Sequence, residues 1–153
     1  MENKYDSTAD TLWHIKRVGE MLGESAIALI ERASVHDWSK LVNPEKELFD
    51  EFTPKLKEST YGSKEYKENL KGLGPALEHH YTMNSHHPEH RPGGVNDMDL
   101  FDLIEMVVDW KAATERHANG DFLKSLEINR VRFGLSDQLY MIIKNHYHRY
   151  LSM

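Results

Sequence analysis

Histidine is enriched in this chain of 153 residues: there are ten, and five of them lie between residues 79 and 90. The adjacent pair His36-Asp37 falls where a helical pattern ends, so both side chains can turn toward one point as the backbone leaves helical geometry. The chain has no cysteine, which excludes Cys-ligated zinc, iron–sulfur clusters and thiol catalysis. A metal site must therefore use imidazole nitrogens and carboxylate oxygens, which suit Mn, Fe, Co, Ni or Zn.

Two isolated residues are further candidates for such a site. His14 sits beside the apolar stripe of a predicted helix over residues 8–23, so it can point inward. Asp109 lies in the strongly apolar run of residues 104–110. Because Asp102 and Glu105 share its side of that helix, a solvated acidic face is the alternative interpretation of Asp109.

The histidine cluster contains two competing pairs at helical spacing. His80 is in register with the apolar residue Leu77, on the inward side of a predicted helix, and His87 follows it seven residues later in the same phase. His79 and His86 form the other in-phase pair. The spacing favours His80 and His87 for a metal or phosphate site. It does not decide whether His79 and His86 occupy that site instead.

The elements that must position these residues are helical, because apolar residues recur at the helical period along nearly the whole chain. We therefore expect the all-α class: one compact domain over residues 1–153, formed by a bundle of six or seven helices. Its motif-bearing core spans about residues 8–117, with C-terminal helices over about 121–151. The expected elements are helices over 8–23 and 25–37, a short helix from Asn43, a polar connection over 54–62, a helix from Ser63 with a kink or break at 72–75, irregular chain over 85–96, and helices over 98–117, 122–133 and 136–151.

Composition narrows the classes of partner and compartment. The net charge of −6 argues against nucleic acid as the main partner. No apolar stretch approaches the roughly 20 residues that span a bilayer, and the polar N-terminus has no signal-peptide pattern. These features lead us to expect a cytoplasmic protein that does not bind membranes.

The order of the candidate residues resembles the HD-domain superfamily of metal-dependent phosphohydrolases. That family places a histidine on one helix, an adjacent His-Asp pair on the next and a distant aspartate on a later helix, an order that His14, His36-Asp37 and Asp109 reproduce. The string over residues 36–40 is similar to the family's His-Asp-x-Gly-Lys, with Ser39 in the glycine place. The resemblance spans residues 14–114.

The resemblance implies an HD-like fold and hydrolysis of a nucleotide or another small phosphoester by metal-activated water. It implies one or two divalent transition-metal ions, with Asp37 bridging if there are two. Lys40 would act with Asp37 in catalysis by offsetting negative charge on the substrate phosphate. The ligands implied are His14, His36, Asp37 and Asp109, with His80 and His87 completing a second site.

Two other functions remain open at this stage. Some HD-domain proteins use a similar ligand order to hold two irons that activate oxygen, and a non-catalytic helical module with a structural metal is the second alternative. The chain also resembles a small, uncharacterised bacterial and phage family whose members carry a His-His-Tyr…His-His-Pro-Glu-His string, found here from residue 79 to residue 90. That likeness covers nearly the whole chain and implies no activity.

Overall fold

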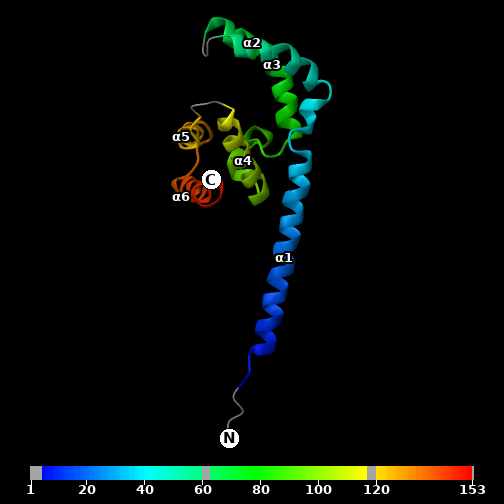
Figure 1. Ribbon diagram of the computed structural model, residues 1–153, viewed down its shortest axis with the longest axis vertical. Coiled ribbons are helices and arrows are strands. Elements are labelled where there is room, and N and C mark those ends of the chain that lie inside the picture. The colour runs from blue at the N-terminus through cyan, green and yellow to red at the C-terminus, as the bar shows by residue number, and fades with distance from the viewer. Residues whose placement is uncertain (1–4, 60–62, 117–119, 153) are drawn as a thin grey trace. The chain divides into compact units, whose positions relative to one another are not determined.

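The computed structural model describes residues 5–59, 63–116 and 120–152, and these residues form helices and turns but no strand (Figure 1). This confirms the predicted all-α class. The six α-helices are α1 (Thr8–Val35), α2 (Glu45–Glu58), α3 (Lys64–Met83), α4 (Leu100–Glu115), α5 (Phe122–Phe133) and α6 (Asp137–His146). Shorter segments are the 3₁₀ turns Trp38–Leu41, Pro88–His90 and Gly94–Asp97, and a π-helical segment over Tyr147–Leu151.

The chain divides into two units, Met1–His36 and Asp37–Met153. This division does not test the prediction of a single domain, which stays a prediction. The predicted end of the motif-bearing core, at residue 117, lies outside the described residues. In the described part of the chain, no helix combines the length and the apolar character needed to cross a membrane.

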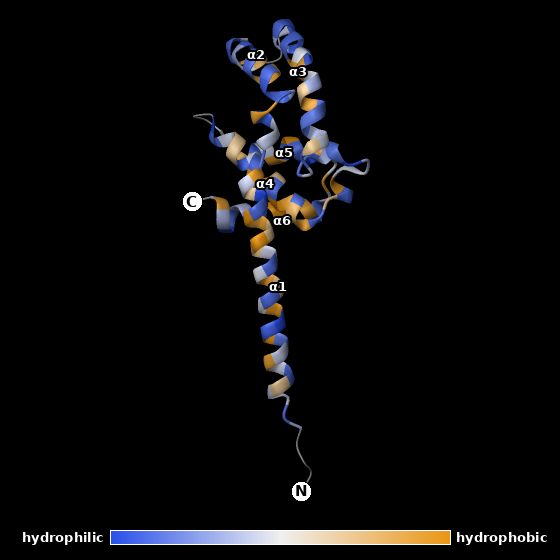
Figure 2. Cartoon of the chain, turned by 90° about the vertical axis from the view of Figure 1, so that its right-hand side faces the viewer, coloured by the Kyte–Doolittle hydropathy of each residue, from blue (hydrophilic) through white to orange (hydrophobic). Residues whose placement is uncertain are grey.

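The first unit contains a single helix, so the predicted break between residues 23 and 25 is wrong. Ser25 does not cap a new helix; its hydroxyl donates to the carbonyl of Met21, 2.9 Å away and one turn earlier in the same helix. An interior glycine such as Gly23 costs about 1 kcal/mol relative to alanine, which weakens a helix without having to end it. Hydrophobic and hydrophilic residues alternate along α1 (Figure 2), and none of its residues is buried.

The second unit begins with the helix pair α2 and α3, which lie side by side (Figure 1). Their close approach explains Gly72, because a Cβ there would lie 2.4 Å from the ring of Phe52 on α2. Of the predicted kink or break at residues 72–75, the break is wrong, since α3 continues through Pro75, and the kink stays a prediction. The predicted cap is confirmed: the Ser63 hydroxyl accepts a hydrogen bond from the Tyr66 amide at 3.0 Å.

The predicted polar connection over 54–62 is also partly wrong, because α2 continues through Pro54 to Glu58. Pro54 is exposed, so water can satisfy the carbonyl that loses its helical partner. The packing of α2 against α3 helps to keep the helix intact despite the proline. Residues 60–62 lie outside the described residues.

The hydrophobic core of the second unit lies where α4, α5 and α6 meet, and Figure 2 shows hydrophobic residues gathered there. The predicted helix over 122–133 coincides with α5. An aspartate caps α5 at one end, and Gly134, in a left-handed conformation with φ 63°, ends it at the other. The buried core residues are Met106, Val107, Phe122, Leu126, Leu135, Tyr140 and Ile143.

Candidate metal centre

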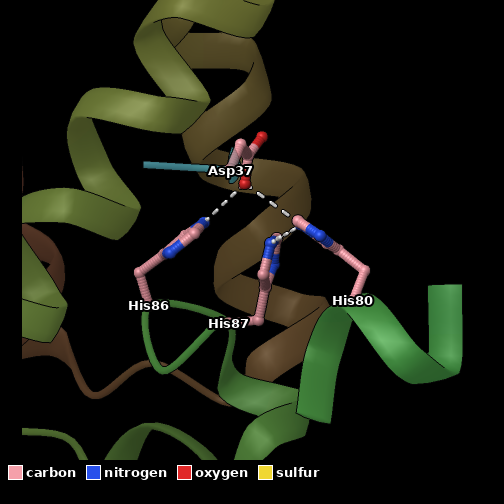
Figure 3. Close-up of side chains that lie close together, drawn as sticks. All are labelled: Asp37, His80, His86 and His87. Atoms are coloured by element: carbon pink, nitrogen blue, oxygen red, sulfur yellow. Dashed lines mark hydrogen bonds and ion pairs between the residues drawn. The ribbon is translucent and has the colours of Figure 1, made fainter. Parts of the chain in front are cut away.

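Four side chains of the second unit converge in one place: Asp37, His80, His86 and His87 (Figure 3). Each offers one ligand atom, and these atoms all lie within 4.8 Å of one another. Nε2 of His80 is 3.1 Å from Oδ1 of Asp37 and 2.9 Å from Nε2 of His87. Nε2 of His86 lies 3.6 Å from the same Asp37 oxygen. The structure thus brings three imidazoles to one carboxylate.

Three neighbouring segments supply this group. Asp37 has φ 56°, a left-handed conformation that aspartate tolerates better than most residues, and the 3₁₀ turn Trp38–Leu41 follows it. His80 lies in the last turn of α3, and His86 and His87 belong to the loop after that helix. A backbone held in a sparsely populated conformation is common where a side chain must be aimed at a functional site.

A buried glutamate sets the orientation of His80. Oε2 of Glu45 accepts from Nδ1 of His80 at 2.9 Å and from the Ser39 hydroxyl at 3.0 Å, and Glu45 is 0% exposed. Asn84 donates to the Ser39 hydroxyl at 2.8 Å, which aligns that hydroxyl with the carboxylate. With its proton on Nδ1, His80 presents the lone pair of Nε2 to Asp37 and His87. A carboxylate behind a histidine in this way is the usual support of a metal-ligating imidazole.

His79 does not join the four-residue group. Its Nδ1 donates to Oε1 of Glu45 at 2.8 Å, and its side chain is 37% exposed. The two adjacent histidines of α3 therefore bind the two oxygens of one carboxylate, but only His80 turns its other nitrogen toward Asp37.

His86 has a carboxylate behind it as well. Its Nδ1 lies 3.1 Å from Oε1 of Glu105 on α4, and the residue is 2% exposed. The loop that carries it is fixed to α4 by the buried Asp102, which accepts from the Ser85 hydroxyl at 2.7 Å and from the Arg91 guanidinium at 2.5 Å. Both ends of the histidine loop are thus held by one aspartate.

The protonation state of His87 suits a ligand. Burial, together with the nearby His86 and His80, lowers the pKa of His87 to about 3, while Asp109 and Asp37 act in the opposite direction. The ring is therefore neutral at physiological pH, as metal coordination requires.

The distances fit a first-row divalent ion. Metal–ligand bonds of about 2.1 Å at tetrahedral or octahedral angles hold neighbouring ligand atoms about 3.0 to 3.4 Å apart. The contacts from Asp37 to His80 and His86, and from His80 to His87, measure 3.1, 3.6 and 2.9 Å, close to that range. Three imidazoles and one carboxylate suit zinc, iron, manganese, cobalt or nickel.

Asp109 and Lys40 flank this group. A carboxylate oxygen of Asp109 lies within 4.8 Å of one from Asp37, and Asp109 acts on the pKa of His87. The ammonium of Lys40 is 2.5 Å from Oδ2 of Asp37, on the carboxylate oxygen that does not contact the histidines, and 5.6 Å from the centre of the Phe49 ring.

The two remaining predicted ligands belong to the first unit. His14 lies on α1, and because the helix is continuous it stands about 32 Å along the axis from the last residue, Val35. The helix therefore does not bring His14 to the end where His36 follows. His36 directly precedes Asp37 in the chain, and its role as a ligand stays a prediction.

Sequence reasoning missed the two supporting carboxylates and ranked His86 below His87. The Asp37 group contains His86 together with His80 and His87, so the two in-phase pairs are not alternatives. A loop replaces the helix after Met83, and adjacent histidines in a loop can point to one place without helical register. Glu45 carried no local signal, because an acidic residue in the first turn of a helix is common without any buried partner.

Residues 3–149 match the model of a protein family of unknown function, DUF5662. Comparisons with curated proteins and with solved structures gave no match. Neither finding links the chain to the HD-domain superfamily, so that resemblance stays a prediction. Because the match covers nearly the whole length, the chain belongs to the family of unknown function DUF5662.

Proposed function

We propose that this protein is a metal-dependent phosphohydrolase that acts on a small phosphoester. One observation carries the proposal: Nε2 atoms of His80 and His86 face the same oxygen of Asp37, and each imidazole has a carboxylate on its other nitrogen. Side chains that only fill a core do not require two carboxylates to orient two imidazoles toward a third carboxylate.

Asp37, His80, His86 and His87 would hold the ion, and Glu45 and Glu105 would keep two of the imidazoles in the correct tautomer. When bound, a divalent metal supplies a Lewis acid that polarises a phosphoryl group and lowers the pKa of water toward neutrality. Beside these four protein ligands, an ion that accepts more than four ligands, such as manganese or iron, would still have room for a water or a substrate oxygen.

Lys40 and Asp109 have separate proposed roles beside the ligands. Lys40 places a fixed positive charge next to Asp37, where it can offset negative charge that develops on the phosphoryl oxygens. The carboxylate of Asp109 lies close enough to Asp37 to accept a proton from the attacking water. A water oxygen then bonds to phosphorus, the ester P–O bond breaks, and the alcohol oxygen leaves with a proton from solvent.

The proposal is tested by metal content and turnover together. Purified full-length protein is loaded with Mn²⁺, Fe²⁺ or Zn²⁺, its bound metal is quantified by mass spectrometry, and phosphate release is measured on a panel of phosphomonoesters. Asp37→Asn is the test variant, because asparagine also tolerates a left-handed backbone. Asp50→Asn, an exposed residue of α2 that pairs with Lys46, is the matched control.

We expect bound metal and phosphate release in the wild-type protein and in Asp50→Asn, and loss of both in Asp37→Asn with the fold retained. Bound metal without turnover on any phosphoester would favour the non-catalytic module. Oxygen consumption by the iron-loaded protein, without phosphate release, would favour the oxygenase.

A further inference from the structure

A cavity of about 240 Å³ opens beside the proposed metal centre, with His87 and Asp109 in its wall. It lies between α4 and α5, and its remaining lining comes from the end of α3 and the loop after it. Pockets for drug-sized ligands measure roughly 300–1,000 Å³, so this cavity suits a smaller molecule, of the size of one sugar ring. A phosphoryl group at the metal would leave its organic part in this cavity.

One face of α5 gives the cavity a polar wall. Ser125, Asn129 and Arg132 all line it, and their spacing of four and three residues places them on one side of the helix. The amide of Asn129 lies 3.5 Å from the Ser125 hydroxyl. Tyr81 adds a phenol from α3. Amide, hydroxyl and phenol groups both donate and accept hydrogen bonds, as a neutral alcohol does.

The charge of the wall does not favour a second anion. The guanidinium of Arg132 is 2.8 Å from Oε1 of Glu89, which also lines the cavity, so the two charges offset each other. Asp109 adds a negative charge nearer the metal centre. An ion pair of this kind can still bind hydroxyl groups, because the guanidinium donates and the carboxylate accepts.

The cavity also has an aromatic lining. Trp110 and Phe133 both line it and stack on each other, with ring centroids 5.7 Å apart and planes inclined by 9°, and the Arg132 guanidinium lies 4.7 Å from the centre of the Phe133 ring. Aromatic side chains in a cavity wall can contact the apolar C–H groups of a ring or a polyol chain while polar side chains bind its hydroxyl groups.

Resting on the proposed function, we propose that the substrate is a small phosphomonoester whose organic part is rich in hydroxyl groups and carries no second charge, such as a sugar or polyol phosphate. The polar face of α5 and the Arg132–Glu89 pair bind the hydroxyl groups. Trp110 and Phe133 cover the apolar side.

Binding is measured by calorimetry on metal-loaded, full-length protein with non-hydrolysable phosphonate analogues, so that the result does not depend on turnover. The probes are the phosphonate analogues of sorbitol 6-phosphate, hexyl phosphate, glycerol 3-phosphate and 3-phosphoglycerate, each named below by its parent phosphate. The variants are Arg132→Met and Asn129→Leu, with Arg130→Met as the matched control. Arg130 stands on the same helix, pairs with Asp137 and does not line the cavity.

We expect sorbitol 6-phosphate to bind at least tenfold more tightly than hexyl phosphate. Each test variant should weaken its binding about tenfold, which corresponds to about 1.4 kcal/mol and lies within the range for the loss of one hydrogen bond. Arg130→Met should bind like the wild type. Equal or tighter binding of hexyl phosphate, or preference for 3-phosphoglycerate over glycerol 3-phosphate, would overturn the inference.

Different results would contradict the proposed function and the assignment of the cavity. If the hydroxyl preference is found but no phosphoester is hydrolysed by the metal-loaded protein, the proposed function is wrong and the polyol site stands. If phosphoesters are hydrolysed without any effect of hydroxyl groups or of Arg132→Met on binding, only the assignment of the cavity is wrong.

Discussion

At the scale of single residues, the candidate site depends on which nitrogen of each histidine faces inward. Glu45 accepts from Nδ1 of His80 and of His79, and Glu105 lies beside Nδ1 of His86. A carboxylate on Nδ1 leaves the lone pair on Nε2, and Nε2 of His80 and of His86 is the atom that faces Asp37. The supporting carboxylates would therefore hold the imidazoles in the orientation that metal binding requires before any ion binds.

Glu45→Gln removes the negative charge behind His80 but keeps a group that can form a hydrogen bond. We expect its metal affinity to fall by about 10- to 100-fold, as is typical when a supporting partner of a ligand is changed. Titration with Zn²⁺ against a competing chelator measures this. Glu47→Gln, at an exposed position of the same helix turn, is the control and should bind like the wild type. Equal affinities in both variants would refute the role of Glu45.

The low pKa of His87 determines how this residue makes the stability of the metal-free protein depend on pH. Its pKa of about 3 in the folded state lies below the ordinary value of 6.5, so the unfolded chain binds a proton more readily. The contribution of neutral His87 is complete above about pH 6.5 and is lost as the pH falls from there toward 3.

Urea unfolding of metal-free protein at pH 7, 6 and 5 measures this dependence. We expect His87→Gln to flatten the loss of stability toward low pH, whereas His148→Gln, at an exposed position, should follow the wild-type curve. If the stability of His87→Gln falls toward low pH as steeply as that of the wild type, His87 is not the source of this pH dependence.

At the scale of secondary-structure elements, the spacing of α2 and α3 controls the distance between Glu45 and His80. Gly72 permits the close approach, while a Cβ added at Gly23, in the interior of α1, meets nothing within 4 Å. A comparison of these two helical glycines distinguishes the effect of packing from the effect of helix propensity.

We expect Gly23→Ala to stabilise the protein by up to about 1 kcal/mol, because alanine favours a helix interior. Gly72→Ala should be less stable than Gly23→Ala by about 1–3 kcal/mol, because the new methyl group must displace the Phe52 ring. Thermal or urea unfolding of the two variants measures the difference. Equal stabilisation by both would show that α2 does not pack closely at Gly72.

Sequence patterns predicted elements well where local signals and packing agree. The helix predicted over 122–133 has the bounds of α5, and the structure adds an aspartate cap at its start and a left-handed glycine at its end. Gly23 and Pro54 misled the prediction, because glycine and proline lower helix stability locally while packing or neighbouring turns decide whether a helix ends. The contact of Glu45 with His80 joins residues 35 positions apart, and no local pattern carries it.

At the scale of the whole molecule, metal binding would connect segments distant in the sequence. Asp37 stands 43 positions before His80, so an ion bound by both closes a long stretch of the second unit. An ion that binds only the folded protein stabilises it by about 4 kcal/mol at a free concentration 1,000 times its dissociation constant.

Saturating divalent metal should therefore raise the melting temperature by about 8 to 16 °C for a chain of this size. Differential scanning calorimetry with and without metal measures the shift. Asp37→Asn should show little of it, and Asp50→Asn should show all of it. A shift of the same size in Asp37→Asn would mean that the stabilising ion binds elsewhere.

The proposed function requires above all that Asp37, His80, His86 and His87 hold one metal ion together. Anomalous diffraction from a metal-loaded crystal, collected at the absorption edge of the metal, tests this directly. We predict an anomalous peak about 2.0–2.3 Å from Oδ1 of Asp37 and from the imidazole nitrogens of the three histidines. A fully loaded protein whose anomalous peak lies away from these four residues would contradict the account.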